Sequence, residues 1–290
     1  VKNYYVWATF AEKAFKEKGF DHIKTLHGII DPSSFCRLPD EERLLLRNRQ
    51  NIDVDSFIVG FVFRNQLRKS VPNLLDGFSI FKKRNPKSNA KLLLHTNWSE
   101  GWDIPRLLDE KKIDKNDILA TYFCSKCNSY EVKKFSSNEE DCRYCGSKGS
   151  QATVSVSGGV DESQLNEIYN LMDVYCHPFT SGGQEIPVQE AKLTELITLV
   201  TNYSCGTDSC TNESGGFPLQ WSEYREPGTQ FIKASTLKES ISKNLTKVFK
   251  MPKSKRKSLG KKARAFVTNN YGIEAIGKKL EGIIDSMPEV

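Results

Sequence analysis

The clearest chemical pattern in the sequence is a set of four cysteines in two pairs, Cys124-x2-Cys127 and Cys142-x2-Cys145. Each pair can offer two thiolates from one tight turn, and together they make a tetrahedral sulfur site that suits Zn²⁺. Four protein ligands leave no position for a water, so the sequence predicts a structural zinc ion rather than a catalytic one. The residues between the pairs offer little apolar surface. We therefore expect metal binding to supply most of this segment's folding free energy.

A second pattern is basic. Arg64 and Lys69 follow the continuously apolar run 57–63, which is typical of a strand buried on both faces of a parallel sheet. Ligands bind beyond the carboxyl ends of such strands, where a guanidinium and an ammonium can neutralise a diphosphate. The alternative interpretation is that both cations only cap the loop.

A third segment, residues 176–191, joins a predicted strand to a predicted helix through a loop that contains glycine. Such a loop lets backbone amides and a helix N-terminus approach a phosphate or a sugar closely. His177 at the strand end either packs in the core or contacts the ligand. The other candidate ligand-binding residues of this loop and the helix start are Gly182, Gly183, Ile186 and Pro187.

The elements that must position these residues alternate along the chain. Apolar runs predict strands at 56–63, 91–95, 118–123, 174–177 and 198–202. Helical patterns fall between them at 72–83, 103–112, 161–171 and 187–196, and a long helical tail begins at 236. This alternation predicts an α/β fold with a doubly wound, parallel, Rossmann-like sheet.

The first 50 residues form a separate unit in this interpretation. Residues 3–8 and 23–30 are predicted strands, and residues 10–18 are a predicted amphipathic helix, so the three make a βαβ unit. A charged connection, 38–51, leads to a domain boundary near residue 50. The cysteines define an insertion at residues 122–152 within the second unit, which we call the cysteine insertion.

Taken together, the basic and glycine-containing segments resemble the retaining GT-B glycosyltransferases of family four, also called glycosyltransferases group one. Arg64 and Lys69 have the five-residue spacing of the family's arginine and lysine, and Pro187-Val188-Gln189-Glu190-Ala191 matches the end of its donor motif. The resemblance implies that Arg64 and Lys69 bind the donor diphosphate and that Glu190 binds the donor ribose.

One position departs from the family pattern. Gly182 stands eight residues before Glu190, where the family has its first glutamate. Glu185, three residues further on, either takes over contact with the transferred sugar or is only a carboxylate at a helix start.

The function implied by the resemblance is transfer of a sugar from a nucleotide diphosphate sugar to an acceptor hydroxyl, with retention and without a catalytic metal ion. Residues 51–290 would be the nucleotide-sugar-binding domain, and residues 1–50 the end of the acceptor domain and the connection between domains. The N-terminal acceptor domain would then be missing, since the chain starts at Val1 without a methionine. The acceptor (a glycan, lipid, protein or nucleobase), the donor base and the sugar stay open.

Composition limits the alternatives. The net charge of +6, from 42 basic and 36 acidic residues, suits an anionic ligand but falls short of a dedicated nucleic-acid binder. Two alternatives stay open: a nucleic-acid-associated zinc-ribbon protein that uses the basic run 250–264, and a catalytically silent GT-B interaction module. The apolar runs are too short to span a membrane. Unpaired cysteines with metal-site spacing favour a reducing, cytoplasmic location.

Overall fold

The computed structural model describes residues 3–136, 138–155 and 157–287. Its centre is one mixed sheet of eight strands in the order β10-β9-β8-β3-β4-β5-β6, with β7 also paired to β5. The strands are β3 (Phe57–Val62), β4 (Ala90–His95), β5 (Ile118–Cys124), β6 (Tyr130–Lys134), β7 (Gln151–Thr153), β8 (Val174–His177), β9 (Ile197–Thr201) and β10 (Gly216–Leu219). All pairs from β10 to β5 are parallel, whereas β6 and β7 run antiparallel to β5.

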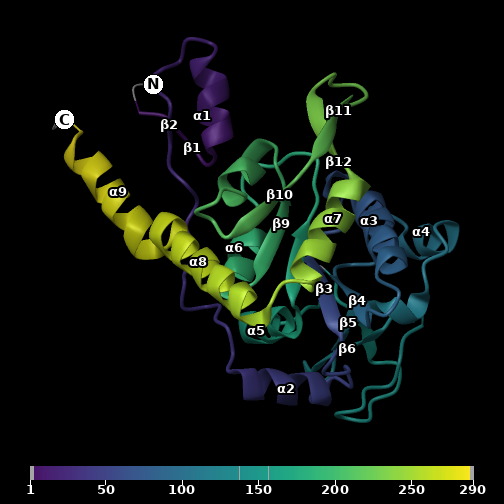
Figure 1. The fold of residues 1–290 in the computed structure, drawn as a ribbon. Helices are drawn as coiled ribbons and strands as arrows, with labels where there is room; N and C mark the ends of the chain where they lie inside the picture. Colours follow the sequence, from purple (N-terminus) through teal and green to yellow (C-terminus); the bar gives the residue numbers. More distant parts are fainter. Residues whose placement is uncertain (1–2, 137, 156, 288–290) are drawn as a thin grey trace.

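Helices cover both faces of this sheet, as a doubly wound fold requires (Figure 1). On one face α3 (Val71–Arg84) packs against α7 (Lys238–Phe249), and Gly77 permits the close approach because a Cβ there would lie 2.6 Å from Ile241. The other face carries α5 (Glu162–Leu171), α6 (Ile186–Leu193) and α8 (Lys253–Tyr271). The shorter α4 (Ile104–Glu110) and the 3₁₀ turns η1 (Leu67–Lys69), η2 (Lys115–Asp117) and η3 (Ser204–Ser209) lie in connections.

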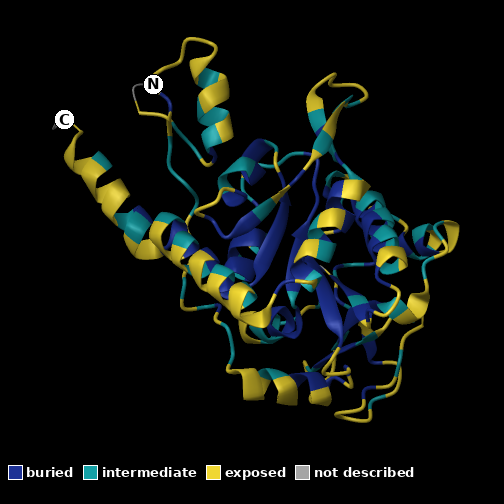
Figure 2. Ribbon diagram, viewed as in Figure 1, coloured by how far each residue is buried: buried dark blue, intermediate teal, exposed yellow. Residues whose placement is uncertain are grey.

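The core follows the apolar runs of the sequence. All six residues of β3 are buried, and Figure 2 shows the central strands in dark blue beneath helices that expose one side. A strand buried on both faces needs apolar residues at every position, which explains why this run does not alternate. The predicted parallel α/β fold is confirmed.

The first 50 residues include the predicted βαβ unit. Strands β1 (Tyr5–Val6) and β2 (Lys24–Thr25) pair in parallel on either side of α1 (Thr9–Lys16), although both strands are shorter than predicted. The charged connection contains a helix, α2 (Asp40–Arg49), whose first turn is acidic and whose last turn is basic. This charge order complements the helix dipole and stabilises a helix in this segment. The sequence analysis had predicted only a connection there.

The predicted helical tail from residue 236 is present as three helices, α7, α8 and α9 (Ile273–Asp285). A hairpin that the sequence did not indicate, β11 (Trp221–Arg225) and β12 (Ile232–Thr236), precedes them. Pro252 precedes α8 and Gly272 separates α8 from α9, so the breaks fall at residues that interrupt helices. In the part of the chain that the structure describes, no helix combines the length and apolarity needed to cross a membrane.

Candidate functional site

The loop after β3, residues 63–70, carries three basic side chains, Arg64, Arg68 and Lys69, and these differ in burial and partners. Arg64 is largely exposed, with its Nε 3.2 Å from Glu100 Oε2 in the loop after β4. Lys69, at the end of η1, has only 4% of its side chain exposed. Ser70 then takes a left-handed conformation with φ of 44°, which turns the chain into α3. The structure therefore buries Lys69 and leaves Arg64 in solvent.

Four side chains form what we call the Glu185 cluster: Arg68, Lys69, His177 and Glu185. The Glu185 carboxylate, 5% exposed, accepts from Arg68 Nη1 at 2.5 Å and from the Lys69 ammonium. Its Oε2 lies 2.9 Å from His177 Nε2. The cluster lies where the carboxyl ends of β3 and β8 meet, and it brings three of the predicted site residues together.

The charge state of the cluster follows from burial and pairing. Burial alone would raise the pKa of Glu185, but its contacts with His177 and Lys69 outweigh burial and hold this pKa well below its ordinary value. Burial lowers the pKa of Lys69, which the Glu185 carboxylate opposes. Burial, with the charge of Lys69 beside it, lowers the pKa of His177 to about 4. Near neutral pH the cluster therefore holds two cations, one carboxylate and a neutral imidazole.

The hydrogen bonds of His177 define its tautomer. With its hydrogen on Nε2, the neutral ring donates to the ionised Glu185, and Nδ1 is then an acceptor. The hydroxyl of Tyr175, on the same strand, lies 2.9 Å from Nδ1. The Val62 carbonyl is also 2.9 Å from this hydroxyl, so two acceptors compete for one phenol hydrogen.

The Glu185 carboxylate occupies space that is available only because residue 182 is a glycine. A Cβ at position 182 would lie 2.5 Å from Glu185 Oε1 and 3.4 Å from Arg68 Nη1. The neighbouring Gly183 is exposed, and a Cβ there would meet nothing within 4 Å. The position at which the family pattern has a glutamate is thus next to the carboxylate of Glu185 in space.

The start of α6 faces the same region. Glu185 occupies the N-cap position without a side-chain capping bond, Ile186 is exposed, and Pro187 stands in the first turn, where a missing N–H costs nothing. Glu190 lies further along the helix and has a different environment. Its carboxylate accepts from Tyr169 of α5 at 2.6 Å, and burial raises its pKa against the effect of that bond.

A narrow pocket of about 10 Å³ separates the start of α6 from the N-terminal segment. Trp7, Gln184, Glu185, Cys205, Asp208 and Tyr271 are among the residues that line it. The N-terminal segment is tied down here, because Thr9 N–H donates to Asp208 at 3.0 Å and Gln184 exchanges two hydrogen bonds with Gly28. A pocket of this size holds about one water at most, so a larger ligand must approach from the exposed side of the loop.

Sequence reasoning missed two members of this region. Arg68 contacts Glu185 directly. It could have been predicted as a site residue, because it is a third cation in the same loop, between Arg64 and Lys69. Tyr175 orients His177, and period-2 alternation along β8 puts both side chains on one face of the sheet.

The four paired cysteines converge as predicted. Their sulfur atoms all lie within 4.8 Å of one another, with Cys124 to Cys145 at 3.8 Å and Cys127 to Cys142 at 3.7 Å. Zinc–thiolate bonds of about 2.3 Å in a tetrahedron imply sulfur separations of about 3.8 Å, so the donor set fits Zn²⁺. The four cysteines form a candidate metal centre in which protein ligands occupy all four coordination positions.

Both cysteine turns have the same backbone form. The N–H of Asn128 donates to Cys124 O at 3.0 Å, and the N–H of Gly146 donates to Cys142 O at 2.8 Å. Asn128 and Gly146 both have positive φ, of 57° and 70°, which asparagine and glycine tolerate best.

The rest of the cysteine insertion corrects one expectation. β6 pairs with β5 of the main sheet, Val132 is buried, and Phe135 stacks on Trp98 with ring centroids 3.9 Å apart. Pairing with the main sheet and these apolar contacts therefore stabilise this strand without a metal ion. Metal binding would order the two cysteine turns rather than supply most of the segment's folding free energy.

In sequence, the chain matches no protein-family profile and no curated protein. In structure it is similar to a glycosyltransferase from Rickettsia africae, with a TM-score of 0.66 and 16% identity over 97% of this chain and 62% of that one. It is also similar to Anabaena HepE in complex with UDP, with a TM-score of 0.69 and 11% identity over 99% and 64%. A third similar structure is the C-terminal domain of a glycosyl transferase group 1 family protein, LpcC, from Francisella tularensis, with a TM-score of 0.54 and 14% identity over 84% and 99%.

These similarities define the fold, which is that of GT-B glycosyltransferases. The chain spans about three fifths of the length of the Rickettsia and Anabaena proteins but nearly the whole of the Francisella domain.

Proposed function

We propose that this chain is the donor-binding half of a glycosyltransferase that moves a sugar from a nucleotide diphosphate sugar to an acceptor hydroxyl with retention of configuration. The observation that carries the proposal is the Glu185 cluster, which leaves an excess positive charge beside the start of α6. A diphosphate is the natural ligand of two cations and a helix N-terminus. The structures of HepE with UDP and with UDP-glucose, which share this fold, support the ligand class.

In this proposal each residue has a distinct part. Lys69, together with the exposed Arg64, stabilises the charge that develops on the leaving diphosphate, an effect that can contribute several kcal/mol. Glu185 holds Lys69 and Arg68 in place, which makes it a positioning residue. It would contact the transferred sugar directly only by giving up these two ion pairs. Glu190, oriented by Tyr169 at 2.6 Å, holds the donor ribose.

The parts of the chain follow from this assignment. Residues 51–290 are the nucleotide-sugar-binding domain, and residues 1–50 are the end of an acceptor domain with its connection. Cys124, Cys127, Cys142 and Cys145 hold a structural Zn²⁺ in the insertion 122–152. The four other cysteines, Cys36, Cys176, Cys205 and Cys210, form no disulfide, which supports a reducing, cytoplasmic location.

Gly182 favours a second candidate, a GT-B module without catalytic activity, because the family glutamate is absent there. Both candidates bind a nucleotide in the same place, and they differ in turnover. Release of nucleotide diphosphate from a nucleotide sugar by the complete protein would support the enzyme. Binding without release under the same conditions would support the silent module.

The binding step is tested by calorimetric titration of the zinc-loaded chain with UDP, GDP and ADP. We expect one nucleotide to bind, and Lys69→Met and Glu190→Ala each to weaken binding on the order of tenfold, since each removes a charged hydrogen-bonding group. Lys255→Gln, an exposed substitution in the first turn of α8, is the control and should change nothing. If no nucleotide binds a folded sample, the donor-binding proposal is wrong.

A further inference from the structure

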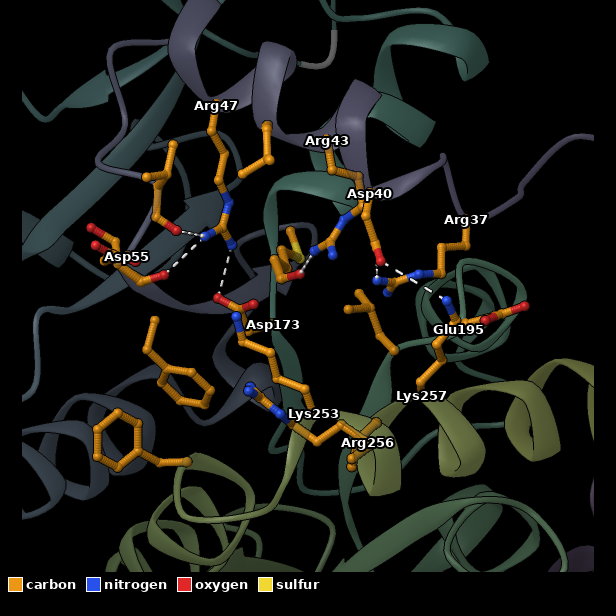
Figure 3. Close-up of a pocket in the computed structure, with 18 of the residues that line it drawn as sticks. Arg37, Asp40, Arg43, Arg47, Asp55, Asp173, Glu195, Lys253, Arg256 and Lys257 are labelled. Carbon is orange, nitrogen blue, oxygen red and sulfur yellow. Dashed lines mark hydrogen bonds and ion pairs between the residues drawn. The ribbon is translucent and has the colours of Figure 1, made fainter.

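A large cavity of about 480 Å³ opens at the amino-terminal edge of the sheet, the edge opposite the Glu185 cluster. Its walls come from α2, from the residues that begin β3, β8 and β9, and from the first turn of α8 (Figure 3). Cavities of this volume fall in the range that holds small-molecule ligands.

The charged residues of the lining are more often basic than acidic. Six basic residues face four acidic ones: Arg37, Arg43, Arg47, Lys253, Arg256 and Lys257 against Asp40, Asp55, Asp173 and Glu195. Two of the acids are already engaged. Asp173 accepts from Arg47 and from the Ile58 N–H, each at 2.8 Å, and Asp40 pairs with Arg37 at 2.7 Å.

Three of the cations lack a carboxylate partner. Among the described residues, none lies within ion-pair distance of Arg43, Lys253 or Arg256. Arg43 is held in place by the carbonyls of Asn170 and Met172, at 2.9 and 2.8 Å. Burial, with the charge of Arg37 nearby, lowers the pKa of Arg43 to about 10. Asp55 and Glu195 also have no ion-pair partner among the described residues, so the six basic and four acidic side chains leave the lining with a net charge of +2.

The start of α8 adds to this charge. A helix N-terminus favours acidic residues, yet the first turn of α8 has none, and its N-cap, Pro252, makes no side-chain capping bond. Lys253 and Arg256 stand there instead, whereas α2 begins with Asp40, Glu41 and Glu42. A bound anion would supply the negative charge that this helix start lacks.

The cavity also has apolar walls. Met172, Leu196, Ile197 and Phe249 line it, and the Arg256 guanidinium lies 6.0 Å from the Phe57 ring centroid. Apolar walls suit the carbon part of a small molecule. They offer nothing to the hydrated phosphates of a nucleic-acid strand, which is recognised mainly through its backbone charge.

We propose that this amino-edge cavity binds a small phosphorylated metabolite, between a pentose phosphate and a mononucleotide in size, with its phosphate among Arg43, Lys253 and Arg256. Bidentate and charge-assisted bonds from the two guanidiniums suit a phosphate dianion. The site is separate from the donor site proposed above, because the two lie at opposite edges of the sheet.

The test is a calorimetric titration of the zinc-loaded chain with inorganic phosphate, ribose 5-phosphate and UMP at fixed ionic strength. We expect saturable binding of ribose 5-phosphate or UMP. The double variant Lys253→Gln/Arg256→Gln should weaken it on the order of tenfold or more. The matched control is Lys255→Gln/Lys262→Gln, which removes the same charge from exposed positions of the same helix outside the cavity and should bind as the unmodified chain does.

Three results would overturn the proposal: no saturable binding of any probe, equal losses in the two double variants, or binding of a single-stranded oligonucleotide alone. Circular dichroism on both double variants confirms that they are folded. Lys69→Met separates this site from the donor site, since it should leave ribose 5-phosphate binding unchanged. Loss of that binding in Lys69→Met would place the probe at the Glu185 cluster and contradict the inference.

Discussion

Glu185 is a buried carboxylate held by two cations and an imidazole, and its position depends on a neighbour without a side chain. A Cβ on residue 182 would collide with its Oε1, which accepts from Arg68, while its Oε2 contacts His177. A carboxylate with such contacts cannot move away without breaking them. Any side chain at position 182 would therefore have to displace this carboxylate from its partners.

Gly182→Ala tests this dependence. Since the added Cβ would displace a carboxylate held by three partners, we expect the free energy of unfolding in urea to fall by about 1–3 kcal/mol. Gly183→Ala is the matched control, because its Cβ meets nothing within 4 Å, and it should change stability by less than about 0.5 kcal/mol. Equal effects of the two substitutions would show that Glu185 is not fixed by its neighbours.

His177 predicts a pH dependence of stability. Its pKa is about 4 in the folded chain against an ordinary 6.5, so between these values the unfolded chain binds a proton that the folded chain does not. Stability should therefore be complete above pH 6.5 and fall as the pH drops toward 4, by up to about 3 kcal/mol from this residue.

Urea unfolding at several pH values, with the unmodified chain and His177→Gln, measures this effect. We expect the substitution to reduce the slope between pH 6.5 and 4. His95, whose pKa burial also lowers to about 4, should keep part of the slope. An unchanged slope in His177→Gln would mean that the imidazole titrates normally in the folded chain.

Among the elements, the cysteine insertion combines a strand that the main sheet holds with two turns that depend on their cysteines. β6 and β7 both pair with β5, whereas the turns at Cys124–Cys127 and Cys142–Cys145 have few contacts outside the insertion. Removing the metal should therefore loosen the turns and spare the strands.

Zinc analysis with hydrogen exchange checks this expectation. We expect one zinc per chain, lost on chelation and in Cys142→Ser, with faster exchange at residues 125–129 and 139–150 and little change at residues 119–122. Cys36→Ser, at an exposed free cysteine, should keep the zinc. Unfolding of the whole sheet on chelation would restore the expectation that the metal supplies most of the insertion's folding free energy.

Elements with strong local signals were predictable, and those set by distant contacts were not. The run at β3 is apolar at every position, and β8 was predicted with its observed bounds. β6 carries a mixed sequence, Tyr-Glu-Val-Lys-Lys, and becomes a strand only because β5 offers it an edge. The β11–β12 hairpin was also missed, although it turns at Pro227-Gly228, where Gly228 has φ of 86°.

At the scale of the whole molecule, the two edges of the sheet have different roles in this account. The carboxyl edge holds the Glu185 cluster, and the amino edge holds the larger cavity between α2 and α8. The sequence indicated the first edge because strand ends and glycine loops mark it. It did not indicate the cavity, whose lining comes from segments that are up to 220 residues apart, such as Arg37 and Lys257.

The predicted site residues that meet in the structure are those marked by strand ends and the loops that follow them. Lys69, His177 and Glu185 meet because each lies at the end of a strand or in the loop that follows. Arg64 and Glu190 point elsewhere, to Glu100 and to Tyr169, and no local pattern specifies these partners. Their predicted ligand contacts stay predictions.

A crystal structure of the chain with a bound nucleotide diphosphate tests the central claim most directly. We expect the diphosphate to lie at the carboxyl edge of β3 and β8, beside Lys69 and the start of α6, with the ribose near Glu190. A nucleotide found only in the amino-edge cavity, or bound without contact to Lys69 or α6, would contradict the proposed donor site.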